Sequence, residues 1–296
     1  MKITVLGSNG FLSTAISKYA NNEGWTLSLY GLDEPVNHRF DRFVHCNFVE
    51  SELDCDGLLD SDIVVYAIGA GIQSNLKESS DLIYNLNVAT PVKICNKLKD
   101  LGYNGCFVTF GSVFEMGETG ETHFFSEIEV LTSNAPAPSD YVVSKRMLSR
   151  FVAGYKHSFT HWHFIIPTIY GEGENPKRLI PYTINAIRNG ETLHFTSGNQ
   201  TRQYLYVGEV PVVLKLAYEK KLPSGVYNIQ GKETHTVKEI VELIHKALGK
   251  NIPDGCFGTI QRSDECMEFL ALDGTNLFKF IGFSPVISIE DAIMRY

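Results

Sequence analysis

The stretch MKITVLGSNGFLS, residues 1–13, decides the fold. Lys2–Leu6 is a short apolar run that ends at Gly7, which predicts a buried strand followed by a turn. Residues 11–22 then show helical spacing. Glycines between a strand and a helix let the backbone approach a pyrophosphate at the helix N-terminus. The spacing GxxGxxS therefore predicts a dinucleotide-binding turn, with an ordinary strand–turn–helix as the alternative.

Strand-like and helical patterns alternate along the chain as far as Gly171, which predicts a parallel sheet covered by helices on both faces. The expected strands are residues 25–30, 62–71, 105–110 and 163–171, and the expected helices are residues 81–101 and 139–155. Beyond Gly171 we expect helices at 178–190 and 234–249, strand, turn and strand at 192–207, and a segment at 226–231.

The resulting prediction is an α/β fold, a doubly wound parallel Rossmann sheet with a smaller C-terminal α/β lobe. The dinucleotide-binding domain covers residues 1–171, and a later segment, about 203–225, returns to it. Residues 172–296 form mainly the substrate-binding lobe.

Composition is that of an ordinary globular protein, with 44% apolar and 20% charged residues among 296. The net charge of −8, from 34 acidic and 26 basic residues, argues against non-specific nucleic-acid binding. The 6 cysteines show no zinc spacing, so we expect no metal site and buried, reduced thiols. We find neither a signal peptide nor a stretch long enough to span a membrane, and we expect a cytoplasmic protein.

Two further pieces carry chemistry. Tyr141 and Lys145 lie one helical turn apart on one face, and an ammonium near a phenol lowers the phenol's pKa. The tyrosine can then pass a proton to or from a carbonyl or carbinol oxygen while hydride moves. Ser112 follows the strand at 105–110, where doubly wound sheets bind ligands, and it can bond the same oxygen. Taken alone, each piece also has an explanation that involves no chemistry. Tyr141 and Lys145 can be a surface pair, and Ser112 can cap the end of a strand.

In combination these pieces resemble the extended short-chain dehydrogenase/reductase family, in its NAD-dependent epimerase/dehydratase group of nucleotide-sugar enzymes. PTIYGEGE at 167–174, NQTRQYLYV at 199–207 and residues 265–293 are similar to further segments of that family. The resemblance therefore covers nearly the whole chain. It implies that Ser112, Tyr141 and Lys145 form the catalytic trio around a nicotinamide.

The resemblance also implies two sets of binding residues. Those for the cofactor are Gly7, Ser8, Asn9, Gly10, Phe11, Leu12, Arg39, Asn47, Phe48, Ala67, Ile68, Gly69, Asn87, Tyr141, Lys145 and Pro167. Those for the substrate are Gly71, Ser112, Asn175, Arg178, Arg202 and Arg262.

Some of these assignments have structural alternatives. Arg202 is the main candidate for the substrate pyrophosphate, followed by Arg262 and then by Lys177 and Arg178, and each is otherwise a solvated surface charge. Asn175 is otherwise a loop cap. Asn87 is otherwise an amide that packs helices.

The tip of the second predicted strand bears on the cofactor. NAD-binding relatives usually place a carboxylate there to bond the adenosine ribose. This chain has Gly31 at the tip, which removes repulsion toward a 2′-phosphate, and His38 or Arg39 follows a few residues later. These features favour NADP(H). NAD(H), with Asp33 reaching back to the ribose, is the alternative.

The residues after Ser112 bear on the reaction. The 4,6-dehydratases of the resembled group carry two acids there, whereas this chain has Val113 and Phe114, so we do not expect dehydration. The segments GSVF, LIPYTINAIRNGE and TRQYLYV are similar to those of 4-reductases of nucleotide-linked deoxysugars. The expected function is an NAD(P)H-dependent reductase of a nucleotide-linked 4-keto-6-deoxy sugar, with hydride to C4 and Tyr141 as proton donor.

Two alternatives remain open from the sequence. One is an NAD-dependent nucleotide-sugar 4-epimerase, and the other is a non-catalytic dinucleotide-sensing protein. The resembled family also implies a homodimer formed through the helices at 81–101 and 139–155.

Overall fold

The central sheet is built outward from β1 (Lys2–Leu6), which pairs in parallel with β2 (Thr26–Gly31) and β4 (Ile63–Tyr66). The computed structural model of the protein describes residues 1–51, 53–72, 76–156 and 158–296. The other strands are β3 (Arg42–His45), β5 (Cys106–Ser112), β6 (Thr160–Ile166) and β9 (Gly225–Asn228). Their order is β3-β2-β1-β4-β5-β6-β9, and every pairing is parallel. The predicted Rossmann sheet is confirmed.

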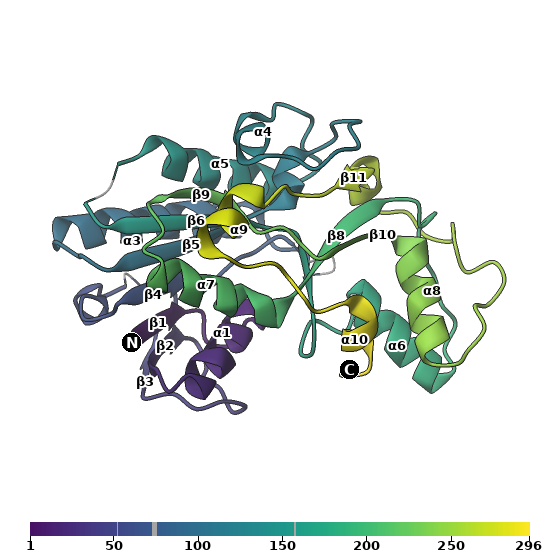
Figure 1. Ribbon diagram of the computed structural model, residues 1–296, viewed down its shortest axis with the longest axis horizontal. Coiled ribbons are helices and arrows are strands. Elements are labelled where there is room, and N and C mark those ends of the chain that lie inside the picture. Colours follow the sequence, from purple (N-terminus) through teal and green to yellow (C-terminus); the bar gives the residue numbers. More distant parts are fainter. Residues whose placement is uncertain (52, 73–75, 157) are drawn as a thin grey trace.

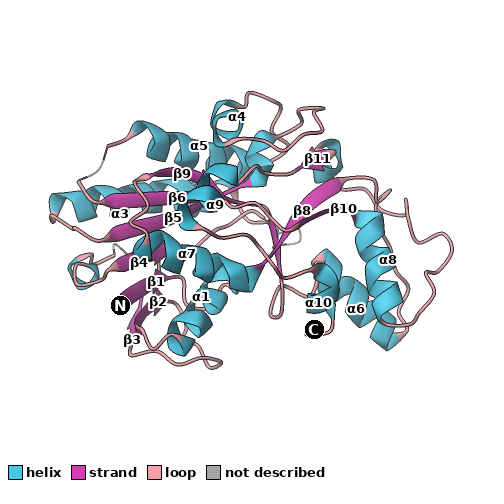
Figure 2. Ribbon diagram, in the orientation of Figure 1, coloured by secondary structure: helices cyan, strands magenta, loops and turns pink. Residues whose placement is uncertain are grey.

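Helices cover both faces of this sheet because successive strand residues point to opposite faces (Figure 2). Ile63 and Val65 pack in one core with α1 and α7, whereas Val64 packs in the opposite core with α3. The helices of this lobe are α1 (Phe11–Asn22), α2 (Ser80–Tyr84), α3 (Thr90–Asp100), α5 (Asp140–Gly154), α7 (Val210–Glu219) and α9 (Thr275–Ile281). Shorter helical segments are η1 (Asp56–Leu58), η4 (Val113–Met116), α4 (Glu127–Thr132), η5 (Val207–Glu209) and η6 (Ser263–Cys266).

The segment between α2 and α3 is a π-helical turn, η3 (Asn85–Ala89). The sequence analysis predicts one continuous helix over residues 81–101. A π turn inside a helix widens it by one residue and occurs mostly at functional sites. Here the turn carries Asn87, whose buried side-chain amide bonds the backbone of Ala70.

A smaller second sheet forms around β8 (Thr201–Tyr206), and Figure 1 shows it beside the central sheet. This strand pairs in parallel with β7 (Thr168–Tyr170) and β11 (Phe269–Leu270), and antiparallel with β10 (Glu233–Thr236). The helices of this lobe are α6 (Leu179–Asn189), α8 (Val237–Ala247) and α10 (Ile289–Ile293). The predicted second lobe is therefore present.

Two segments differ from the expected secondary structure. Residues 163–171 divide at Pro167 into β6 and β7, which belong to different sheets, because proline lacks the amide hydrogen that a continuous ladder needs. Residues 192–197 contain no strand. Leu193 and Phe195 instead fill a small core of the second lobe, so their apolar pattern reflects burial rather than strand pairing.

The chain returns to the first lobe twice after residue 171. α7 and β9 do so close to the predicted segment 203–225. α9 also does so, because Leu277 and Ile281 pack in the same core as α1. This second return lies within residues 172–296, which the sequence analysis assigns mainly to the substrate lobe. A single apolar helix face does not say which of two cores it will join.

Among the described residues, none of the helices has the length and apolar character required to cross a membrane.

Glu209, at the end of η5, ties the C-terminal segment to the junction of the two lobes. Its side chain is buried, and its Oε1 accepts hydrogen bonds from the amides of Val286 at 2.6 Å and Ile287 at 3.3 Å. Burial raises the pKa of this carboxyl, and the two amides partly offset the effect. This buried carboxyl therefore holds the two amides of the segment before α10, while Tyr170 donates to the carbonyl of Ile287.

We predict that Glu209→Leu lowers the free energy of unfolding by about 2 kcal/mol, because both backbone amides lose their charged acceptor. Urea denaturation followed by circular dichroism measures the change. Glu219→Gln, at the exposed end of α7, is the control and is expected to stay within about 0.5 kcal/mol of the wild type. Equal losses in the two variants would contradict this role of Glu209.

Candidate active site

Two glycines shape the turn between β1 and α1. Gly7 has a φ of +104°, and a Cβ there would lie 2.9 Å from Cγ1 of Ile68, so a larger residue is excluded. Gly10 is the N-cap of α1 and offers no side-chain acceptor to the first helical amides. The buried Ser13 packs there and donates a hydrogen bond to the Gly10 carbonyl at 2.9 Å. The turn thus fits a pyrophosphate at a helix N-terminus.

Ser8 and Asn9 fasten the tip of β2 to this turn. Both side chains donate hydrogen bonds to the carbonyl of Asp33, at 2.8 and 2.9 Å. A Cβ at Gly31 would lie 2.1 Å from Oγ of Ser8. The missing carboxylate at the tip therefore has a steric cause, since any side chain at Gly31 would collide with the turn.

Arg39 does not lie at this tip. Its carbonyl accepts a hydrogen bond from the Asn21 side chain, near the end of α1, and the adjacent Asp41 bonds the backbone of Leu27. Leu27 is four residues before Gly31, or about 13 Å at roughly 3.3 Å per residue. The loop after β2 therefore carries the backbone of Arg39 back along α1, and the binding of the cofactor by its side chain stays a prediction.

His38 follows the same course. Burial lowers its pKa, and the Lys18 ammonium in α1 adds to the effect. It therefore lies against α1 rather than at the strand tip.

Other predicted cofactor residues gather at the carboxyl edge of the sheet. They follow the ends of neighbouring strands: Asn47 and Phe48 after β3, Ala67, Ile68 and Gly69 after β4, Pro167 after β6, with Phe11 and Leu12 in the first turn of α1. The Phe48 ring packs edge-on against Tyr66, at a centroid distance of 6.4 Å. The side chain of Asn47 caps its own turn by accepting from the amides of Val49 and Glu50.

Asn87 acts as a structural clamp at this edge. Its amide exchanges two 2.9 Å hydrogen bonds with the backbone of Ala70 and donates a third, also 2.9 Å, to Oγ of Ser144. Its side chain is 1% exposed. The π turn thereby fixes the loop after β4 against α5, so the alternative of a packing amide is the one that the contacts support.

The proposed catalytic side chains meet at the end of β5. Lys145 is buried in α5, and its Nζ donates a 2.9 Å hydrogen bond to the carbonyl of Phe110. The same Nζ lies 5.8 Å from the centroid of the Tyr141 ring. Ser112 is the last residue of β5, and its hydroxyl lowers the pKa of Tyr141. Gly71 packs against Tyr141, since a Cβ there would lie 3.2 Å from the tyrosine Cβ.

The pKa of Tyr141 differs from the sequence expectation. The net pKa is about 12: burial is the largest cause and raises it, Glu115 also raises it, and Ser112 and Arg178 partly offset these effects. Lys145 is itself buried, which lowers its pKa to about 8. The structure therefore presents a protonated phenol beside a cation that titrates near neutral pH, where the sequence suggested a phenol with a lowered pKa.

Val113 and Phe114 occupy the positions after Ser112. Val113 is fully buried in a core cluster. The Phe114 ring lies edge-on to Tyr141 at 6.4 Å, and the guanidinium of Arg202 lies 5.7 Å from its centroid. An aromatic ring, rather than an acid, therefore lies next to the tyrosine.

The second lobe brings Arg178 toward this site. Its guanidinium lowers the pKa of Tyr141 and forms a 3.3 Å ion pair with Glu174, and its side chain remains 31% exposed. Asn175 supplies the loop geometry, because its side chain accepts from the amide of Lys177 at 2.9 Å. Arg178 thus acts on Tyr141 and is still accessible, whereas Asn175 serves at least as a loop cap.

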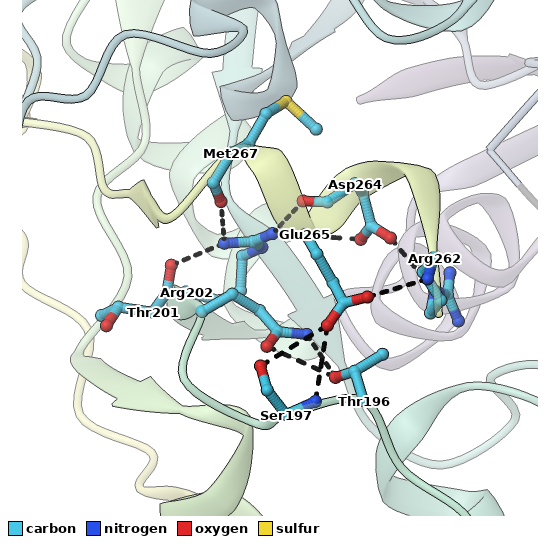
Figure 3. A network of polar contacts seen from close by, with 9 residues as sticks. Thr196, Ser197, Thr201, Arg202, Arg262, Asp264, Glu265 and Met267 are labelled. Atoms are coloured by element: carbon cyan, nitrogen blue, oxygen red, sulfur yellow. Dashed lines mark hydrogen bonds and ion pairs between the residues drawn. The ribbon is translucent and has the colours of Figure 1, made fainter. Parts of the chain in front are cut away.

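Arg202 has a different environment from the one expected (Figure 3). It is 4% exposed, and its guanidinium donates to the carbonyls of Thr201, Met267 and Asp264 at 2.9, 2.7 and 3.0 Å. These bonds hold η6 against β8. The guanidinium therefore holds two segments of the protein together. A sequence motif alone does not distinguish such an arginine from one that binds a phosphate.

Arg262 lies on the same network and is more open. Its Nε donates to Asp264 at 3.1 Å, and about half of its side chain is exposed. Asp264 also lies 3.9 Å from the guanidinium of Arg202. Lys177, by contrast, is an exposed residue of the loop before α6.

The sequence analysis missed two residues. Glu115 accepts a hydrogen bond from the Ser112 amide at 2.7 Å, in a capping box that opens η4. Arg146 donates to the backbone carbonyls of Glu115, Ala135 and Met116. The spacing Ser-x-x-Glu from Ser112 to Glu115 was a readable signal for the first. No local pattern signals the second.

We predict that Asn87→Ala lowers the free energy of unfolding by about 2 kcal/mol, because buried backbone groups of the loop after β4 lose their partner. The affinity for dinucleotide should fall in parallel, since that loop loses its position. Urea denaturation and nicotinamide fluorescence measure the two effects. Asn85→Ala, which removes one 3.2 Å bond on the same turn, should cost less than half as much; equal costs would refute the clamp.

Comparisons with known proteins agree with this geometry. Residues 3–229 match the model of the NAD dependent epimerase/dehydratase family. The chain is 23% identical to the CDP-abequose synthase of Salmonella muenchen, over 99% of this chain and 96% of that protein. It is 24% identical to the enzyme of the same name from Yersinia pseudotuberculosis, over 90% and 91%.

Solved structures share the fold. The UDP-glucose 4-epimerase of Thermotoga maritima superposes with a TM-score of 0.86 at 18% identity, over 99% of this chain and 96% of that one. The dTDP-glucose 4,6-dehydratase of Bacillus anthracis, in complex with NAD, gives 0.83 at 20% identity, over 100% and 94%. The match to the family model over most of the chain shows that the protein belongs to the NAD-dependent epimerase/dehydratase family.

Proposed function

We propose that the protein is an NAD(P)H-dependent reductase of a nucleotide-linked 4-keto-6-deoxy sugar, with hydride delivered to C4. The observation that carries this proposal is the set of side chains around Tyr141. The phenol is protonated and buried beside Lys145 and Ser112, while the next positions hold Val113 and Phe114. Such a site retains a proton donor for a ketone and lacks the acids that water elimination requires.

Each residue of the trio has a defined task in the reduction. The pKa of about 12 keeps Tyr141 protonated, so that it can donate to the oxygen that forms at C4. Ser112 donates a hydrogen bond that polarises the ketone, and the Lys145 ammonium stabilises the phenolate left on Tyr141. A nicotinamide cofactor, when bound, supplies the hydride. Gly7, Gly10 and the first turn of α1 would hold its pyrophosphate.

The relatives support a nucleotide sugar as the substrate. Both curated relatives named above make a CDP-linked sugar, and the chain matches them over 90% of its length or more. The diphosphate of such a substrate needs accessible cations. Arg178 and Arg262 meet this requirement because both are partly exposed, and Arg178 acts electrostatically on Tyr141.

Two features of the β2 tip favour NADPH in the sequence, the missing carboxylate and the nearby His38 or Arg39. The structure supports only the first. Gly31 presents no carboxylate to repel a 2′-phosphate. The backbone of Arg39 lies beside the end of α1, away from the tip, and the Arg42 guanidinium acts on the Tyr30 hydroxyl. We therefore propose that the site accepts NADPH and NADH with similar efficiency.

The proposal also includes a cellular compartment and an oligomeric state. No disulfide joins the cysteines of the described residues, which fits a reducing cytoplasm. The exposed Met147 on α5 fits a homodimer in which α3 and α5 of two copies pack together. Light scattering on the purified protein measures the oligomeric state, and a monomer would contradict the dimer.

The decisive experiment mixes the protein with NADPH or NADH and a panel of nucleotide-linked 4-keto-6-deoxyhexoses, and follows nicotinamide absorbance. We expect stoichiometric oxidation of the cofactor, and a loss of about 10²–10³-fold in kcat for Tyr141→Phe, the scale of general acid catalysis. Oxidation with no member of the panel would overturn the reductase. Bound NAD with sugar epimerisation and no net redox change would identify an epimerase instead. Dinucleotide binding without any turnover would identify a sensor.

The pH dependence of the reduction follows from the two pKa values. Tyr141 stays protonated up to a pH of about 12, whereas Lys145 loses its charge above a pH of about 8. We expect kcat/KM to be flat below a pH of about 8 and to fall above it, with an apparent pKa of about 8. Initial rates across this range test it, and a fall that begins only above pH 10 would exclude Lys145 as the titrating group.

A further inference from the structure

Glu115 is a fully buried carboxyl that the reduction, as derived above, does not use. It lies in η4, directly after the end of β5, and is 0% exposed. Its Oε1 accepts the Ser112 amide at 2.7 Å, and hydrogen bonding by the Ser149 hydroxyl lowers its pKa. A buried carboxyl costs stability unless hydrogen bonds and nearby charges compensate it.

The end of β5 is shaped to hold this carboxyl. A Cβ at Gly111 would lie 2.5 Å from Oε1 of Glu115 and 2.7 Å from Nε2 of His163. Any residue other than glycine would therefore displace the carboxyl or the imidazole. The glycine of the GSVF segment thus makes room for Glu115 beneath Ser112.

The groups that face Glu115 come from two elements, α5 and β6. From β6, His163 bonds the hydroxyls of Thr109 and Ser149, each at 2.8 Å, and burial lowers its pKa to about 3, so it is neutral. From α5, Arg146 donates to backbone carbonyls. Lys145 is the other cation of α5 that acts on Glu115.

Lys145 and Glu115 bind the same stretch of main chain. The ammonium donates to the carbonyl of Phe110, and the carboxylate accepts from the amide of Ser112, two residues farther on. In an extended strand these two groups lie along the same edge. Glu115 raises the pKa of Lys145 against the larger effect of burial. Burial likewise raises the pKa of Glu115, and hydrogen bonds from Ser149 and Ser112, then the charge of Lys145, partly offset it.

We propose that Glu115 is a positioning residue of the reduction, whose carboxylate holds the Ser112 amide and keeps the Lys145 ammonium charged beside Tyr141. The inference rests on the proposed function, since the ammonium serves the proton transfer from the tyrosine. Glu115 acts through Ser112 and Lys145. It supplies the counter-charge that a cation buried among apolar strands requires.

Two substitutions separate the two parts of this role. Glu115→Gln keeps an acceptor for the Ser112 amide and removes the charge. Glu115→Asp keeps the charge and, being shorter by one methylene, withdraws the acceptor. Glu239→Gln is the matched control, because Glu239 caps α8 through the same capping box with Thr236 and is exposed.

The readout is the pH profile of kcat/KM together with kcat and KM. Glu115→Gln should move the basic limb to lower pH by about one unit or more, because Lys145 loses its counter-charge. Glu115→Asp should leave the basic limb in place and lower kcat, because Ser112 loses its support. Glu239→Gln should match the wild type in both respects. A Glu115→Gln profile that superimposes on that of the wild type would overturn the proposal.

Two further measurements keep the test independent of folding and of the sugar. If Glu115→Gln is too unstable for kinetics, urea unfolding of Glu115→Gln, Lys145→Met and the double variant replaces it. If Glu115 and Lys145 interact, the losses of the two single variants should not add up to the loss of the double variant. Additive losses would refute the interaction. If no nucleotide sugar is reduced, the proposed function fails, and the pH dependence of NADH binding, followed by nicotinamide fluorescence, still tests the charge on Lys145. An unchanged dependence in Glu115→Gln would overturn the pairing.

Discussion

The hydrogen bond from the Lys145 ammonium to the Phe110 carbonyl is the constraint on which the site depends. A cation buried between α5 and β5 must find an acceptor there, because desolvation of an unpaired charge costs several kcal/mol. That bond fixes the register of α5 over the end of β5. It thereby places Tyr141, one turn earlier in the helix, beside Ser112. The geometry of the trio is thus a consequence of how one buried charge is satisfied.

The surroundings of the cation are organised around the same requirement. Asn87 bonds both Ser144, next to Lys145, and the loop after β4, so it joins the helix to the edge of the sheet. Glu115 contributes negative charge, and its carboxyl fills the space that the missing side chain of Gly111 leaves open. Polar groups at this depth are tolerated because nearly all are paired, and the pairing gives the site a single arrangement.

Three arginines near the site differ in how much of their surface is exposed. Arg202 is buried and its hydrogen bonds go to backbone carbonyls, so it helps to shape the second lobe. Arg178 and Arg262 keep part of their surface open. Phe114 lies between Arg202 and the tyrosine, which makes the side of the site toward the second lobe apolar next to the reacting group.

The sequence by itself determined the features that local patterns encode. A strand, a glycine turn and a helix lie within residues 1–22, and a tyrosine and a lysine four apart must share a helix face. These patterns were sufficient for the Rossmann sheet and for the position of the trio at its carboxyl edge. Even there the sign of the shift in the Tyr141 pKa was wrong, because burial, which a local pattern does not report, outweighs the neighbouring cation.

Only the tertiary structure decided which distant groups meet. Arg39 is close to the β2 tip in sequence, but its backbone lies beside the end of α1, because the intervening loop follows that helix. Arg202 lies on a motif and is taken up by carbonyls from η6, some sixty residues later. Glu115 gains its role from Lys145, thirty residues farther along the chain. In each case the outcome depends on the path of a loop or on burial between elements, and neither is written in the spacing of nearby residues.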